Sequence, residues 1–372
     1  MLRACACPTT RPFFDEASQQ CGDHPSCAGG QLWDGSGCVC PASRPNFNTA
    51  TSTCVDPCWA GSNWNRGSNR CECDPETPVF DQARRRCVPR SGAPVLAQLS
   101  PQAQQQVFRG GSGTCPEGMV FIPGGTYWMG AGADEGATYE RPQHAVTLSP
   151  FCMDRYEVRV ADYRNCVNAN ACTLPYTFRD EQSFNAFCNW GRAGFDDHPI
   201  NCVDWDQSTR YCGYRGGRLP TEAEWEWAAG GGSRLYPWGD APPSPQLTNL
   251  CGEECIAALN ARGVGQNRQW LVGEQDPWPS TAPVGSFPAG VTPQGLHDMA
   301  GNVFEWTADW YSGYSAVAQA NPSGPTSGTN RVNRGAGWGS GVAGAFRSRA
   351  RTTDVPSHRG VFLGIRCVAR AL

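Results

Sequence analysis

Cysteine is the residue type in this sequence that could do the most chemistry, since 21 of the 372 residues are cysteine. Paired thiolates can hold a soft metal ion, a single thiolate can be a nucleophile, and two thiols can form a disulfide. In the first ninety residues a Cys-x-Cys pair and a third cysteine recur with a period of 33. The nine positions are Cys5, Cys7, Cys21, Cys38, Cys40, Cys54, Cys71, Cys73 and Cys87.

This period predicts three small repeats held together by disulfides, because a unit of 33 residues buries too little apolar surface to fold alone. Zinc is the weaker alternative, since zinc ribbons use Cys-x2-4-Cys knuckles. We expect residues 1–90 to form the repeats, 91–114 a linker, and 115–372 a second domain. In spacing the repeats resemble EGF-like or inhibitor-like modules. We expect them to be a spacer, with binding of a surface partner as the alternative.

Composition limits the possible compartments and partners. So many cysteines indicate an oxidising, extracytoplasmic location, either secreted, periplasmic or at the cell surface. No signal peptide is visible at the first residues, so we expect a truncated N-terminus; a reduced cytosolic protein is the alternative. All 30 basic residues are arginine, which excludes lysine-based catalysis, and the net charge of −4 argues against nucleic acid. No apolar run is long enough to predict a transmembrane segment.

The second domain contains seven short motifs whose order resembles that of the formylglycine-generating enzyme (sulfatase-modifying factor) family. They lie at residues 118–130, 218–226, 236–239, 281–284, 301–306, 334–338 and 364–367. The resemblance covers about residues 118–370 and implies an irregular α+β fold, a variant of the C-type lectin fold. The 44 glycines and 30 prolines agree with little regular secondary structure.

The resemblance also implies calcium, which binds hard oxygen ligands. One expected site uses the side chains of Asp298 and Glu305 with the carbonyls of Gly301 and Val303. The alternative is that the two acids are surface charges.

A second expected site uses Asn249, Asp276 and the carbonyls of Leu250 and Trp278. Here an extra stretch at residues 251–255 lengthens the loop between the two halves, so we expect one or two calcium ions.

Catalytic members of this family oxidise a substrate cysteine in a Cys-x-Pro-x-Arg motif to formylglycine, with O2 and a copper(I) ion held by two cysteines. The matching positions here are Ser340 and Ala345, so copper is not expected. We therefore predict a pseudoenzyme: a calcium-stabilised ligand-binding module without oxidase activity. The alternative is an active oxidase of the same type with a relocated metal at Cys152, Cys188 or Cys202.

Arg347, Arg349 and Arg351 alternate, so on a strand they would share one face. The resemblance places this strand in a groove with Trp338. We expect a peptide, protein or glycan ligand there, at the cell surface. A solvated basic face is one alternative, and a structural surface protein with an empty groove is another.

The resemblance further implies a disulfide between Cys212 and Cys367. If Cys115 is the partner of the third repeat, seven cysteines of the second domain remain, and one must be unpaired or intermolecular. Cys166 with Cys172, and Cys251 with Cys255, are close enough in sequence to form local bridges.

The elements that must position these residues are few. Thr221 and Glu224 form a capping box that predicts a helix ending at Gly230. Further helices are expected near residues 206–212 and 160–167. The Pro-Gly-Gly turn within residues 118–130 predicts a hairpin.

Overall fold

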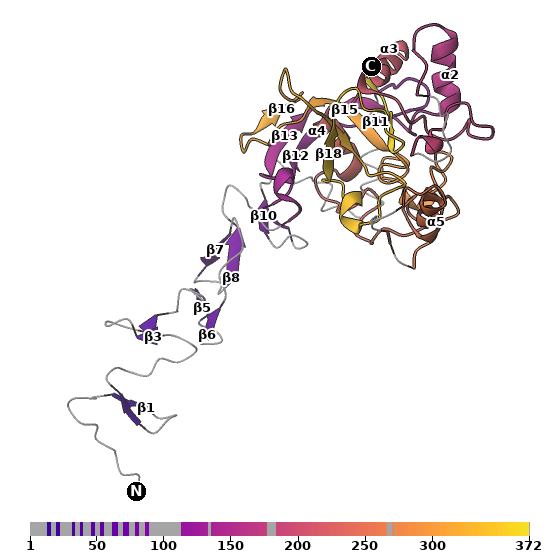
Figure 1. The fold of residues 1–372 in the computed structure, drawn as a ribbon. Coiled ribbons are helices and arrows are strands. Elements are labelled where there is room, and N and C mark those ends of the chain that lie inside the picture. Colours follow the sequence, from indigo (N-terminus) through magenta and orange to yellow (C-terminus); the bar gives the residue numbers. More distant parts are fainter. Residues whose placement is uncertain are drawn as a thin grey trace. The chain divides into compact units, whose positions relative to one another are not determined.

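The computed structural model describes residues 113–371, apart from 133–134, 177–183, 266–269 and 272, and the backbone of ten short strands between residues 13 and 88. The chain divides into two compact units, Met1–Ala93 and Pro94–Leu372 (Figure 1).

The first unit contains antiparallel strand pairs that recur with the cysteine pattern. The pairs are β1 (Phe13–Asp15) with β2 (Gln20–Gly22), β5 (Asn46–Asn48) with β6 (Thr53–Val55), and β9 (Val79–Asp81) with β10 (Arg86–Val88). Between them lie β3 (Leu32–Trp33) with β4 (Cys38–Val39), and β7 (Ser62–Asn65) with β8 (Arg70–Cys73). The backbone pairing of β1, β5 and β9 thus follows the period of 33 seen in the sequence. The predicted disulfides of the repeats lie outside the described residues.

Three small sheets form the second unit. The first has the order β11 (Met119–Ile122), β14 (Phe151–Asp154), β20 (Val368–Arg370), and the second β12 (Gly125–Met129), β13 (His144–Leu148), β16 (Gln319–Ala320). The third has the order β18 (Arg351–Asp354), β17 (Arg331–Arg334), β15 (Phe304–Trp310), β19 (Leu363–Gly364). The pairs β13/β16 and β15/β19 are parallel and the others antiparallel.

The described helices are short. They are α2 (Val160–Asn168), α3 (Trp205–Tyr214), α4 (Glu222–Gly230) and α5 (Glu253–Ala261), with 3-10 turns η2 (Thr138–Glu140), η3 (Phe184–Phe187), η4 (Pro288–Gly290) and η5 (Ala343–Phe346). Three of the helices were predicted, and the capping box of α4 is present, with Thr221 and Glu224 each accepting from the other's backbone N–H. Helix α5 was not predicted.

The expected irregular α+β fold is confirmed. Within the described residues, no helix reaches the length and apolar character that a membrane span needs.

The predicted opening hairpin is wrong, although both of its strands exist. Strand β11 pairs with β14, whereas β12 pairs with β13 in another sheet. The turn carries the chain between these sheets: the carbonyl of Pro123 accepts from the indole of Trp227, and a Cβ on Gly124 would lie 2.5 Å from the carbonyl oxygen of Leu148. The alternation of apolar and small residues predicted the two strands, but it could not predict which strand each of them would pair with.

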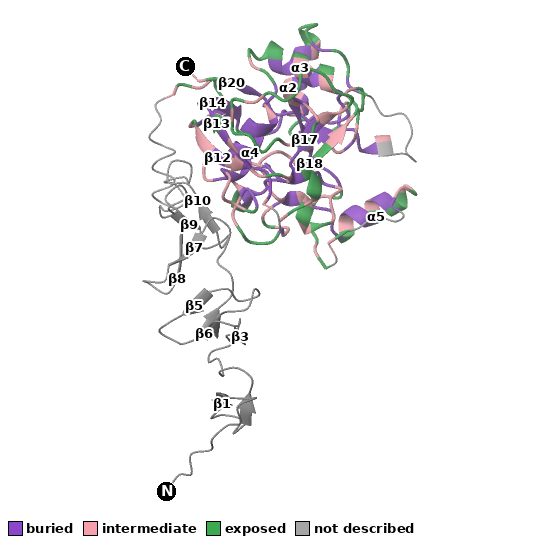
Figure 2. Cartoon of the chain, turned by 90° about the vertical axis from the view of Figure 1, so that its left-hand side faces the viewer, coloured by how far each residue is buried: buried purple, intermediate pink, exposed green. Residues whose placement is uncertain are grey.

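Helix α4 lies at the centre of the second unit, and every one of its residues is buried (Figure 2). It contacts strands of two sheets, β12 and β13 of one sheet and β15 and β17 of another. Its apolar side chains Trp225, Trp227 and Ala228 pack with Tyr127 and Phe151 in one cluster. A second cluster surrounds the disulfide of Cys212 and Cys367.

All ten cysteines within residues 113–371 form disulfides. They are Cys115–Cys152, Cys166–Cys172, Cys188–Cys202, Cys212–Cys367 and Cys251–Cys255. The expected bridge of Cys212 and Cys367 and both local bridges are therefore present.

Two expectations about cysteine are wrong. Cys115 pairs with Cys152 rather than with the third repeat: it lies four residues before β11, which pairs with the strand β14 that contains Cys152. No unpaired thiol remains among the cysteines of residues 113–371, so Cys152, Cys188 and Cys202 offer no thiolate for a relocated metal. The other eleven of the 21 cysteines lie in the first ninety residues, and their side chains are outside the described part of the structure.

Candidate functional site

The two positions that the resemblance assigns to copper lie in the turn before and within η5. The Ser340 hydroxyl accepts a hydrogen bond from the backbone N–H of Gly337 at 3.2 Å, so it closes its own turn. Ala345 packs beside the cluster of Tyr236, Leu250 and Phe346. Neither side chain supplies the soft, anionic ligand that copper(I) prefers.

Helix α5 begins within residues 251–255, the stretch that we expected to lengthen a loop, and it packs against the same turn. The N–H of Cys251 donates to the carbonyl of Ser340 at 2.9 Å. Cys255, Ile256 and Leu259 lie in one buried cluster with Trp338. Helix α5 is thus part of the packing around Ser340 and Trp338.

The structure places the expected groove residue Trp338 in the core. It is 0% exposed, and its indole N–H donates to the carbonyl of Val361 at 3.1 Å. Its ring contacts those of Phe187 and Phe362, with centroids 4.9 and 4.7 Å away. In this arrangement the Trp338 side chain supports the loop rather than lining a surface.

The three alternating arginines do not share a strand face, so that prediction is wrong. Only Arg351 belongs to β18, because η5 and a turn occupy the residues before it. Each arginine has a carboxylate partner instead: Arg347 with Glu140 at 2.7 Å, Arg349 with Glu135 at 2.6 Å, and Arg351 with Glu222 at 2.6 Å. Their charge is largely neutralised within the molecule.

The first expected calcium site lies in a region of surplus buried negative charge. Asp298 is 8% exposed, and Glu305 and Arg366 are 0% exposed and form an ion pair at 2.7 Å. The other Glu305 oxygen accepts from the indole of Trp225 at 2.7 Å. Asp298 accepts from the N–H of Gly285 at 2.6 Å, and burial raises its pKa to about 6.

A further buried acid, Glu157, belongs to this region and was missed from the sequence. Its oxygens accept from the Asn302 amide at 2.6 Å and from the Val303 N–H at 3.1 Å. Burial, and then the charges of Asp298 and Glu305, raise the pKa of Glu157 well above its usual range. No sequence signal could have found it, since 145 residues separate Glu157 from Asn302.

The residues of the second expected site lie near one another. Asp276 accepts from the N–H groups of Leu250 at 3.1 Å and Trp278 at 2.7 Å, which brings the two halves of the predicted ligand set together. Burial raises the pKa of Asp276 to about 7. Asn249 is 1% exposed and donates to the carbonyl of Ser280, but its buried Oδ1 has no hydrogen-bond partner. An orphaned hard oxygen beside a buried carboxylate fits a calcium ion.

Side chains alone do not complete either site. In the described residues, no three His, Cys, Asp or Glu side chains are grouped to hold a metal ion. Calcium at these places would need backbone carbonyls and the Asn249 amide, as the predicted ligand sets do.

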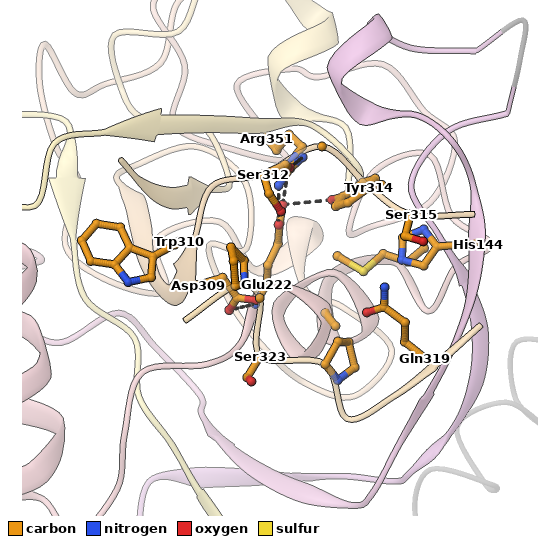
Figure 3. Close-up of a pocket in the computed structure, with 16 residues that line it drawn as sticks. His144, Glu222, Asp309, Trp310, Ser312, Tyr314, Ser315, Gln319, Ser323 and Arg351 are labelled. Atoms are coloured by element: carbon orange, nitrogen blue, oxygen red, sulfur yellow. Dashed lines mark hydrogen bonds and ion pairs between the residues drawn. The ribbon is translucent and has the colours of Figure 1, made fainter. Parts of the chain in front are cut away.

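A cavity of about 320 Å³, not foreseen from the sequence, lies at the other end of β15 (Figure 3). The carboxylate of Glu222 accepts from Arg351 and from the Tyr314 hydroxyl, the latter at 2.9 Å. Asp309 accepts from the N–H of Glu222 at 2.8 Å. Strand β15 has seven residues, so the cavity lies roughly 20 Å along the strand from Phe304 at its start. Phe304 lies against Gly337, in the turn that contains Ser340.

Comparison with known proteins gives consistent results. Residues 103–371 match the family described as "Sulfatase-modifying factor enzyme 1-like domain". Formylglycine-generating enzyme of Mus musculus is 32% identical, covering 68% of this chain and 74% of that protein. The enzyme of the same name from Thermomonospora curvata is 33% identical, covering 69% and 94%.

An inactive relative is equally similar. "Inactive C-alpha-formylglycine-generating enzyme 2" of Mus musculus is 31% identical, covering 68% of this chain and 86% of that protein. The solved structure of PvdO from Pseudomonas aeruginosa has a TM-score of 0.53 at 26% identity, covering 68% and 94%. Overall sequence identity therefore does not distinguish active from inactive members of the family. That distinction depends on the residues at individual site positions.

Proposed function

Because this chain belongs to the sulfatase-modifying factor family, we propose that its second unit is a calcium-stabilised ligand-binding module without the copper-dependent oxidation of a substrate cysteine. The observation that carries this proposal is the pair Ser340 and Ala345. A serine hydroxyl is a hard, neutral oxygen at physiological pH, and alanine has no ligand atom. The Ser340 hydroxyl is also already hydrogen bonded to Gly337.

A relocated copper site has no support in the described part of the chain. Every cysteine within residues 113–371 is in a disulfide, and a disulfide sulfur is not the thiolate that copper(I) requires. The five disulfides also support an extracytoplasmic location.

Calcium supports the fold in this proposal rather than performing chemistry. The first ion would be held by Asp298, Glu305 and the carbonyls of Gly301 and Val303. Both oxygens of Glu305 already accept hydrogen bonds, but each carboxylate oxygen has two lone pairs, so the contacts are compatible with a cation. The positive charge would offset the repulsion among the buried acids.

The second ion would be held by Asn249, Asp276 and the carbonyls of Leu250 and Trp278. It would fill the vacant hydrogen-bonding capacity of Asn249 Oδ1.

The ligand in this proposal is a peptide, protein or glycan. Since Trp338 is buried and Arg347 and Arg349 are ion-paired, the cavity beside Asp309 and Tyr314 is a better candidate for contact than the expected groove. Its hydroxyl, amide and carboxyl groups favour a polar ligand.

The decisive experiment gives the protein copper(I), O2 and a Cys-x-Pro-x-Arg peptide, and follows the peptide by mass spectrometry. We expect neither stoichiometric copper binding nor conversion to formylglycine. The double variant Ser340→Cys/Ala345→Cys is the matched control, and it should gain copper(I) binding. Formylglycine produced by the unmodified protein would refute the proposal.

A further inference from the structure

Residues 251–255, which we expected to lengthen a loop, carry a carboxylate that lies close to the segment leading into Asp276, a residue of the second expected cation site. Glu254 lies in the first turn of α5, and one of its oxygens accepts from the N–H of Gly252 at 3.3 Å. The other oxygen, Oε2, is buried and has no hydrogen-bond partner. A Cβ on Gly252 would lie 2.9 Å from Oε2 of Glu254 and 2.3 Å from the carbonyl oxygen of Glu274, so this carboxylate lies close to the segment that leads into Asp276.

Several bonds hold Glu254 in this position. The disulfide of Cys251 and Cys255 closes the turn around it. The N–H of Glu253 donates to the carbonyl of Glu274 at 3.0 Å, and the N–H of Leu271 donates to the carbonyl of Cys251 at 3.0 Å. The start of α5 is therefore fastened to the segment that leads into Asp276.

This arrangement leaves two unsatisfied buried oxygens beside a buried acid. They are Asn249 Oδ1 and Glu254 Oε2, and Asp276 is 2% exposed. Among the described ion pairs, neither acid has an arginine partner. Buried polar oxygens without a partner are rare, and a hard cation is a partner that suits such oxygens.

We propose that Glu254 is a ligand that this chain adds to the calcium site of Asn249 and Asp276, and that the bound ion fastens α5 over the turn containing Ser340. The proposal rests on the calcium sites of the proposed function. The inner face of α5 is buried and its outer face exposed (Figure 2). Because the N–H of Cys251 bonds to Ser340 and Leu259 packs in the cluster of Trp338, loss of the ion should loosen the covering of that turn.

The test measures calcium binding to the full-length, EGTA-stripped protein by calorimetry. Glu254→Gln should weaken one of two sites by about 10- to 100-fold and leave the other unchanged. Glu254→Asp, which keeps the charge, should weaken it less. Glu253→Gln is the matched control, since it removes the same charge from the exposed neighbouring residue and should change neither site.

Hydrogen exchange supplies a second readout. Removing calcium should speed exchange of the α5 amides in the unmodified protein, and Glu254→Gln should show the faster exchange at calcium concentrations that still protect the unmodified protein. Circular dichroism confirms that each variant is folded.

The outcomes separate this inference from the proposal on which it rests. If Asp276→Asn abolishes one site and Glu254→Gln leaves both affinities unchanged, calcium binding stands and the role of Glu254 is refuted. If Asp276→Asn also changes nothing, the second calcium site itself is refuted, and the inference falls with it.

Discussion

Replacing both Cys212 and Cys367 by alanine should lower the free energy of unfolding by about 5 kcal/mol. The bridge spans 155 residues. In the chain-entropy relation, a closed loop of that length removes about 17 cal/mol/K from the unfolded chain, which is about 5 kcal/mol at 25 °C.

The bridge of Cys166 and Cys172 offers a matched control, because it borders the same buried cluster but spans only six residues. The same relation gives about 2 kcal/mol for its removal. Both double variants delete two buried sulfur atoms, so their packing losses are similar, and the difference of about 3 kcal/mol reports loop length.

The assay is urea unfolding of the full chain, followed by tryptophan fluorescence and extrapolated linearly to water. The repeats are the same in both variants, so their contribution cancels in the comparison. Equal losses in the two double variants would refute the reasoning, since they would show that loop length does not determine the stabilisation.

Three further predictions concern buried charge and backbone. Burial raises the pKa of Asp309 from 3.8 to about 7, so the stability that this residue contributes is complete below about pH 4 and is lost as the pH rises to about 7. Asp309→Asn should therefore flatten the pH dependence of the melting temperature over this range, and an unchanged slope would contradict the assignment. Arg334→Met should cost about 3–5 kcal/mol in urea unfolding, because it leaves the Glu226 carboxylate buried without its partner. Adding Glu226→Gln should recover part of that loss, and no recovery would argue against the pairing. Gly301→Ala should lower the melting temperature, since its φ is +89° and a Cβ would lie 2.3 Å from the carbonyl oxygen of Asn249; an unaltered melting temperature would show that the loop can relax.

The helices show how far local patterns predict this fold. The start of α4 depends on Thr221 and Glu224, which are three residues apart and bond to each other's backbone. Helix α5 was missed because its N-cap, Gly252, makes no side-chain capping bond. Its position depends instead on the disulfide of Cys251 and Cys255 and on bonds to a distant loop.

One part of the candidate site could likewise be predicted from the sequence, and another part could not. The loss of copper ligands could be recognised from the sequence, because ligand chemistry belongs to the side chain itself and Ser340 and Ala345 have no thiolate. The role of Glu157 could not, because its partners are distant in the chain and only folding brings a third acid into that region.

The sequence by itself determined the repeats of period 33, the three helices with local signals, the family motifs and the missing thiolates. Each depends on residue identity or on spacings of a few residues. The tertiary structure alone decided that Cys115 pairs with Cys152, that Trp338 is buried, and that Arg347 and Arg349 are neutralised. Those two arginines bond to acids 207 and 214 residues away, and no local pattern records which charges meet when the chain folds.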